Sequence, residues 1–277
     1  MKDPSARLLF RRLLDQPDED IDLARAALAI AAEEYPELLP TPYLDRLDAL
    51  ARDVEAVAGR SGSQSRLAAL IDRLGRVERF HGNRESYDDP RNSYLNEVLD
   101  RRTGIPLTLS LVYVLVGRRL GLPMAGIAFP GHFLCRCDLE EGFVVLDAYD
   151  GGRQLSLDDC QKLLQSIQRN VTFDRDMLEP ASNRSIVFRM LANLKGAYLR
   201  TDQRDRALST LDRMLIIAPS HPSLFRDRGL LLFQLERFPE ARESLERYQD
   251  LAPGRAAGDT GAMALLAVAR RKRLSIN

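Results

Sequence analysis

The stretch GIPLTLSLVYVLVGRRLGLPMAGIAFPGHFLCR, residues 104–136, carries the signals that predict the fold. Its first half is a nearly uninterrupted apolar run that begins at Pro106. Proline is favoured in the first turn of a helix because its missing N–H would have no partner there. The run ends at Gly117 and two arginines, well short of the ~20 apolar residues that a membrane-spanning helix needs. The stretch therefore predicts a buried central helix.

Short strands are predicted after this helix. Residues 124–129 and 132–139 alternate between apolar and polar side chains, and GFVVLDAYDGGRQLS, residues 142–156, predicts a third strand ending in a Gly-Gly turn. One long helix followed by antiparallel strands is typical of the α+β class. Apolar residues upstream recur at helical spacing. We therefore expect a helical region over 1–80 and an α+β core over 81–180.

The region over 181–277 is predicted to be helical and to repeat itself. Four pairs of positions stand 34 residues apart: Tyr198 and Leu232, Ala207 and Ala241, Leu211 and Leu245, Pro219 and Pro253. This period predicts tetratricopeptide units at about 188–221 and 222–255, followed by a capping helix at about 259–273.

Tetratricopeptide arrays bind proteins or peptides along a concave groove, so a protein or peptide partner is expected. Repeats that capture a peptide carboxylate carry lysine and asparagine at two positions that match Ala192 and Gly196 here, which makes that style of capture doubtful. The alternative is that the repeats mainly pack on the core.

Composition excludes several classes of protein. The 277 residues include 40 basic and 40 acidic side chains, so no strong attraction to nucleic acid or to a membrane is expected. The N-terminus turns acidic where a signal peptide would be apolar, and no export is expected. The three cysteines form no CxxC pair, which favours a reducing cytoplasm. They are Cys135, Cys137 and Cys160.

One of the three histidines stands out. His81 and His221 lie in polar, turn-like contexts and are predicted at the surface, whereas His132 follows Pro-Gly, opens a predicted strand and precedes Asp147 by 15 residues. An antiparallel pair of strands can bring His132 and Asp147 side by side, where the carboxylate would fix the imidazole tautomer. The alternative is a core histidine with Asp147 capping a turn. Clustered metal ligands and a glycine-rich phosphate loop are both missing, so no metal or cofactor is expected.

A family resemblance adds to this interpretation. DPRNSYLNEVLDRRTGIPLTLSLVYVLVGRRLGLPMAGIAFPGHFLCR, residues 89–136, and VVLDAYDGGRQLS, residues 144–156, resemble the transglutaminase-like superfamily, whose core is papain-like. Across roughly residues 40–255 the chain is similar to its bacterial SirB-type branch, which joins this core to tetratricopeptide repeats. The resemblance implies that His132 is the base and Asp147 the residue that orients it.

The resemblance does not assign the role of nucleophile to a cysteine of this chain. The cysteine that opens the central helix in active relatives falls at about Pro106, beside Leu107 and Thr108. A hydroxyl of Thr108 or Ser110 would have to replace the thiol, although the pKa of a hydroxyl lies far above that of a thiol. Alternation along the predicted strand places Cys135 and Cys137 on the face away from His132, and nothing directs Cys160 toward it.

Three hypotheses follow for the function. The favoured one is a transglutaminase-like protein with little or no catalysis, acting as an interaction or regulatory module. Its alternative is a hydrolase or acyl-transferase that uses Thr108 or Ser110 with His132 and Asp147. The third is a pocket that binds a peptide without reacting. Nearby polar residues are predicted either to line this surface or to serve as helix caps: Arg91, Asn92, Asn96 and Glu97.

Overall fold

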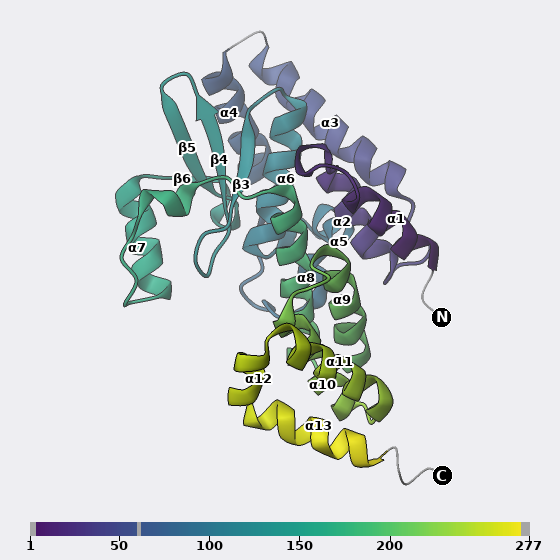
Figure 1. Ribbon diagram of the computed structural model, residues 1–277. Coiled ribbons are helices and arrows are strands. Elements are labelled where there is room, and N and C mark those ends of the chain that lie inside the picture. The colour runs from purple at the N-terminus through teal and green to yellow at the C-terminus, as the bar shows by residue number, and fades with distance from the viewer. Residues whose placement is uncertain (1–3, 60–61, 273–277) are drawn as a thin grey trace. The chain divides into compact units, whose positions relative to one another are not determined.

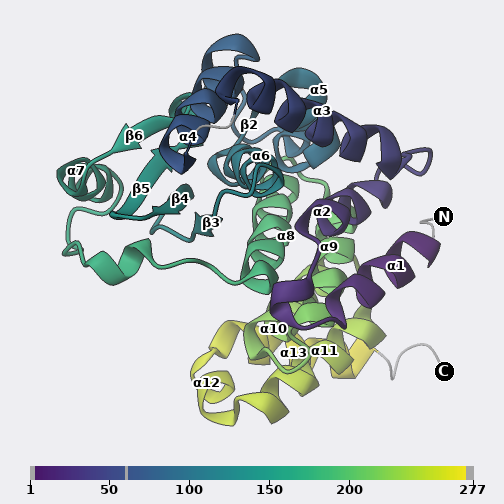
Figure 2. The ribbon, with the colours of Figure 1, turned by 90° about the horizontal axis from the view of Figure 1, so that it is seen from above.

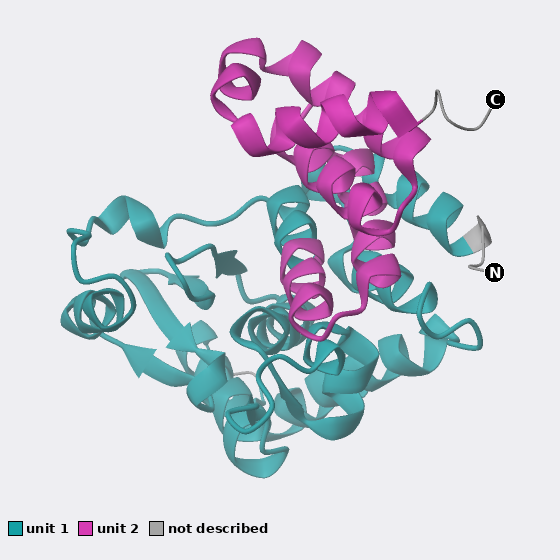
Figure 3. Cartoon of the chain, turned by 90° about the horizontal axis from the view of Figure 1, so that it is seen from below, with its two compact units in different colours: residues 1–190 teal, residues 191–277 magenta. Residues whose placement is uncertain are grey.

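The computed structural model describes residues 4–59 and 62–272, and the chain divides into two compact units, residues 1–190 and 191–277 (Figure 3). The predicted α+β class is confirmed, because unit 1 contains helices and a four-stranded antiparallel sheet. Within the described ranges, no helix combines the length and the apolar character needed to cross a membrane.

Helices fill the described part of the first 80 residues, where apolar spacing predicts them. Helix α2 is almost entirely apolar, and Asp22 caps its start by accepting a hydrogen bond from the backbone N–H of Arg25 at 3.0 Å. A π-helix follows α4 directly, a rare geometry that often marks functional sites. The elements are α1 (Pro4–Leu14), a 3₁₀ helix (Asp18–Asp20), α2 (Leu23–Ala32), α3 (Pro40–Ala58), α4 (Ser63–Ile71) and the π-helix (Asp72–Val77).

The predicted central helix is α6 (Pro106–Arg119), and its residues from Pro106 to Gly117 are all buried. Figure 2 shows it between the sheet on one side and α3 and α5 (Leu95–Arg101) on the other. A 3₁₀ helix (Pro90–Ser93) leads into α5. The short parallel strands β1 (His81–Gly82) and β2 (Thr103–Gly104) pair just before α6 begins. Burial on all sides explains why this helix is apolar around its whole circumference.

The sheet has the order β3-β4-β5-β6 and is antiparallel throughout (Figure 1). Its strands are β3 (Met124–Ile127), β4 (Leu134–Leu139), β5 (Gly142–Asp147) and β6 (Arg153–Leu155). The sequence predicted the first three; β6 was missed because three residues are too few to show alternation. Helix α7 (Leu157–Ile167) packs on the sheet, and a 3₁₀ helix (Arg175–Leu178) follows it. Their shared core includes Leu134, Val145, Leu155, Cys160, Leu164 and Leu178.

Two boundaries of the predicted strands are wrong. Strand β3 ends at Ile127 rather than at position 129. Strand β4 begins at Leu134, and His132 instead ends the turn before it, with its backbone N–H donating to the carbonyl of Phe129 at 3.1 Å. Gly131 in this turn has a φ of +69°, which a residue with a side chain rarely adopts. Face alternation along the strand therefore does not decide where the His132 ring lies.

Unit 2 consists of paired helices, as the 34-residue period predicts, and it begins within α8 (Asn183–Arg200). Three of the four periodic pairs are buried on both members: Tyr198 and Leu232, Ala207 and Ala241, Leu211 and Leu245. Gly229 allows α10 and α11 to approach, since a Cβ there would lie 2.6 Å from Cγ of Leu245. The further helices are α9 (Arg204–Ile217), α10 (Pro222–Gln234), α11 (Phe238–Leu251), α12 (Pro253–Gly258) and α13 (Thr260–Lys272). Helix α13 covers the expected capping helix except its first residue and position 273, which lies outside the described residues.

Candidate functional site

The structure brings His132 and Asp147 together at one end of the sheet. Nε2 of His132 lies 3.1 Å from Oδ1 of Asp147, and the two side chains are only 11% and 7% exposed. The same carboxylate oxygen accepts a hydrogen bond from the backbone N–H of Tyr149 at 3.0 Å. Asp147 thus holds the imidazole and also caps the turn that follows β5, so the two functions weighed for it coexist.

The position of His132 is set by its neighbours. Arg189 donates to the His132 backbone carbonyl at 2.6 Å, and the Tyr149 ring meets the imidazole edge to face, with centroids 6.0 Å apart. Among the described residues, Asp147 is the hydrogen-bond partner of the His132 ring. Because Nε2 faces Asp147, Nδ1 is the nitrogen that would have to activate a nucleophile.

The two hydroxyls at the start of α6 both donate to backbone oxygens. The Thr108 hydroxyl is fully buried and donates to the backbone carbonyl of Asn92 at 2.6 Å, with the carbonyl of Ile105 at 3.2 Å as a second acceptor for the same hydrogen. The Ser110 hydroxyl donates to the carbonyl of Phe133 at 3.3 Å. Both hydroxyls bind backbone oxygens, a common arrangement for Ser and Thr in buried helices.

The thiols are buried and protonated. Burial, with a further contribution from the charge of Asp147, raises the pKa of Cys135 to about 12, and its Sγ–H donates to the carbonyl of Ser110 at 3.4 Å. Burial likewise raises the pKa values of Cys137 and Cys160 to about 11 each. A thiol is nucleophilic as the thiolate, so none of the three is activated near neutral pH.

We expect iodoacetamide at pH 8 to leave all three thiols unmodified in the folded chain and to alkylate all three after unfolding in guanidinium chloride. A raised pKa lowers the thiolate fraction, and burial blocks the reagent. Mass spectrometry of both samples measures the result. Rapid alkylation of Cys135 in the folded chain would contradict this account.

Asn92 lies at the centre of the segment before α6. It is fully buried; its Nδ2 donates to the carbonyls of Ser86 at 2.7 Å and Tyr87 at 3.2 Å, and its Oδ1 accepts from Nδ2 of Asn83 at 3.0 Å. The Asn92 side chain therefore makes its hydrogen bonds within the protein, to the segment over 83–87. The backbone carbonyl of Asn92 accepts from Thr108, so Asn92 links this segment to the start of α6.

Asn96 and Glu97 do not gather around His132. They line a different pocket, of about 590 Å³, with Tyr43 and Asp100 among its other residues. Oδ1 of Asn96 is buried and has no hydrogen-bond partner within the described parts of the chain. The polar set near the turn thus divides between two places, and sequence proximity alone could not separate them.

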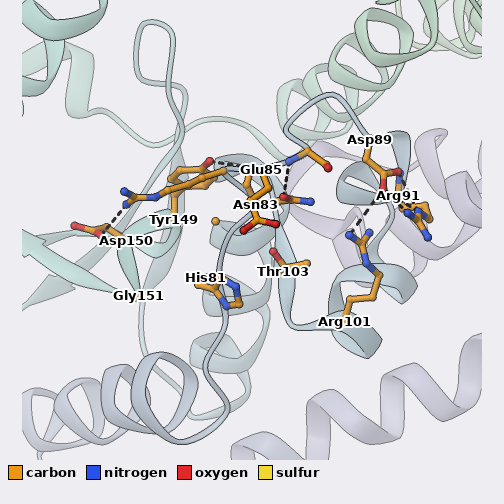
Figure 4. Close-up of a pocket in the computed structure, with 13 residues that line it drawn as sticks. His81, Asn83, Glu85, Asp89, Arg91, Arg101, Thr103, Tyr149, Asp150 and Gly151 are labelled. Atoms are coloured by element: carbon orange, nitrogen blue, oxygen red, sulfur yellow. Dashed lines mark hydrogen bonds and ion pairs between the residues drawn. The ribbon is translucent and has the colours of Figure 1, made fainter. Parts of the chain in front are cut away.

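The pocket beside the His132–Asp147 pair involves residues that sequence reasoning did not select. It has a volume of about 760 Å³, and Tyr149 lines it while its ring also contacts His132 (Figure 4). The Tyr149 hydroxyl donates to the carbonyl of Asn83 at 3.1 Å, and a Cβ on Gly82 would lie 2.3 Å from the ring. The position of Tyr149 two residues after Asp147 was the one available signal. The exposed His81, Arg84 and Arg91 and the half-buried Arg101 are also part of the lining.

A buried central helix, an antiparallel sheet and a histidine–aspartate pair, followed by paired helices, define a transglutaminase-like core joined to helical repeats. The family model of the transglutaminase-like superfamily matches residues 41–192, more than half of the chain, and the chain belongs to this superfamily. A tetratricopeptide repeat model matches residues 194–268. Both parts of the sequence resemblance are thereby confirmed.

Curated relatives agree with this assignment. The chain is 37% identical over 256 residues to a UPF0162 protein of Xylella fastidiosa (strain 9a5c), covering 88% of this chain and 89% of that protein. It is 31% identical over 230 residues to a UPF0162 protein of Vibrio cholerae, covering 81% and 85%. F-box only protein 21 of Homo sapiens is 33% identical over 204 residues, which is 67% of this chain but 31% of that protein. No solved structure matches.

Proposed function

We propose that the chain is a protein-interaction module whose transglutaminase-like core keeps the fold and the His132–Asp147 pair but performs little or no acyl transfer. The observation that carries the proposal is the 2.6 Å hydrogen bond from the Thr108 hydroxyl to the Asn92 carbonyl. It directs the hydroxyl nearest the expected nucleophile position to a backbone oxygen of the chain itself. The contact of Ser110 and the raised pKa of Cys135 support the same proposal.

The tetratricopeptide region supports the part of the proposal that concerns protein interaction. Residues 194–268 match the repeat model, and such arrays present a groove to extended peptides or helices. A protein partner bound through this region is therefore the proposed mode of action. The three unpaired thiols support a reducing compartment, and we propose the cytoplasm.

The test follows acyl transfer and peptide hydrolysis with casein as substrate and a dansylated primary amine as acceptor. The intact chain and His132→Ala are expected to give the same background signal, because the proposal leaves the histidine no activated nucleophile to serve. Time-dependent product that disappears in His132→Ala would establish the alternative, a hydrolase or acyl-transferase.

The same preparations serve as baits in cell extract. A partner recovered by the intact chain and by His132→Ala is expected to be lost with Gly229→Leu, whose side chain would collide with Leu245 and deform the second repeat. A partner recovered equally well by all three baits contradicts binding through the repeats.

A further inference from the structure

The pocket beside Tyr149 has two charged walls. Figure 4 shows Tyr149 and Asp150 on one side, and Asp89, Arg91 and Arg101 on the other. The first wall is closed by Arg84, which donates to Asp150 at 3.3 Å, and Asp150 also pairs with Arg153. In the second, Arg91 binds both carboxylate oxygens of Asp89, with its shortest hydrogen bond at 2.7 Å.

Arg101, the third cation of the pocket, makes no short hydrogen bond with these residues. Its Nη2 lies 3.9 Å from Asp89 and donates one long hydrogen bond, 3.4 Å, to Oδ1 of Asn92. Its Nη1 is buried and has no hydrogen-bond partner in the described part of the chain. The Arg101 side chain as a whole is 25% exposed and lines the pocket, so an acceptor there can replace the long contacts of Nη2, and a charged acceptor binds a guanidinium most strongly.

Asp89 does not serve as a close acceptor for Arg101. Burial alone would raise the pKa of Asp89, but hydrogen bonds from Arg91, with the charges of Arg91 and Arg101, hold it below its ordinary value. Asp89 is thus ionised near neutral pH and committed mainly to Arg91. The guanidinium of Arg101 therefore still has donors that no close acceptor among the described residues satisfies.

The charged side chains that line the pocket restrict the charge of a ligand that can bind there. Three cations and three carboxylates line the pocket, the third carboxylate being the exposed Glu85, which stands between the two walls in Figure 4. One unmet guanidinium with several fixed anions nearby suits a ligand with a single negative charge better than a dianion such as phosphate. The ring of Tyr149 offers an apolar surface to the rest of the ligand.

We propose that this pocket binds the carboxylate of an amino-acid-sized or short peptide ligand, with Arg101 as its anchor. A volume of about 760 Å³ is within the usual range for small-ligand sites. The planar guanidinium fork matches a carboxylate, which would accept from Nη2 in place of its long contacts with Asp89 and Asn92. The pocket lies in unit 1 and its proposed role does not depend on the tetratricopeptide region, so its failure leaves the interaction proposal untouched.

The experiment compares two probes that differ only in charge, N-acetylphenylalanine and N-acetylphenylalaninamide, with the full chain. Chemical shifts of the Asn83 and Gly151 backbone amides report binding in the pocket. The acid is expected to bind about tenfold or more tightly than the amide, which is the effect typical of one hydrogen bond to a charged group. Inorganic phosphate is expected to bind more weakly than the acid. Equal affinity of acid and amide, tighter phosphate binding or shifts confined to other regions would overturn the proposal.

Three variants sharpen the test. Arg101→Gln should weaken binding of the acid about tenfold and leave the amide unchanged. Arg25→Gln removes the same charge from an exposed site in α2 and should change neither. Glu85→Gln should tighten binding of the acid severalfold by removing a like charge, an increase that misfolding cannot mimic. The proposal is wrong if Arg101→Gln behaves as Arg25→Gln does, or if Glu85→Gln weakens acid binding.

Discussion

Asn92→Ala is expected to lower the free energy of unfolding by about 2–4 kcal/mol, because each buried polar group left without a partner costs roughly 1–3 kcal/mol. The change removes both hydrogen bonds to the carbonyls of Ser86 and Tyr87 and the acceptor for the Asn83 amide. The segment over 83–87, of which residues 83–86 line the pocket, would lose these side-chain bonds and keep the backbone hydrogen bond from Asn83 to the carbonyl of Gly104. Chemical denaturation followed by circular dichroism measures the difference.

Asn96→Ala is the matched control. Asn96 is 4% exposed and is also an asparagine of this region, but its Oδ1 has no partner within the described residues. Removing an oxygen that makes no hydrogen bond leaves no donor newly unpaired, so we expect a change below about 1 kcal/mol. Equal losses for the two variants would show that side-chain volume, rather than the hydrogen bonds of Asn92, holds this region.

Gly75→Ala is expected to destabilise unit 1 by about 3 kcal/mol, at the upper end of the usual cost of overpacking. A Cβ on Gly75 would lie 2.1 Å from the carbonyl oxygen of Gly151 and 3.2 Å from the Tyr113 hydroxyl. The nearer obstacle is backbone, so no side-chain rotation can relieve the collision. Either the π-helix or the turn after β5 must move, and that turn carries Tyr149.

Gly62→Ala adds the same atom where nothing lies within 4 Å. Its cost should stay below about 1 kcal/mol, the typical price of alanine in place of glycine at a helix N-cap. Thermal unfolding of both variants measures the contrast. A loss for Gly75→Ala no larger than that for Gly62→Ala would mean that the approach of the π-helix to Gly151 is easily relaxed.

Much of the fold could be predicted because local patterns report local structure. The apolar run after Pro106 predicted α6, alternation predicted β3 to β5, and the 34-residue period predicted the paired helices of unit 2. The pairs β1–β2 and β5–β6 were beyond such reasoning, since strands of two or three residues have no measurable period.

For the candidate site, the sequence by itself determined which chemical groups are present: one histidine and one aspartate at a separation suited to neighbouring strands, and no cysteine where the central helix begins. Only the tertiary structure decided what those groups face. It directs the Thr108 hydroxyl to the Asn92 carbonyl, which precedes it by 16 residues, and places Tyr149 between the His132–Asp147 pair and the pocket. It also leaves Nη1 of Arg101 without a hydrogen-bond partner among the described residues. The physical reason is that these contacts join segments from distant parts of the chain. A local sequence pattern does not record which side chain of a distant segment will lie next to a given group, so it predicts neither the hydrogen bonds nor the burial of that group.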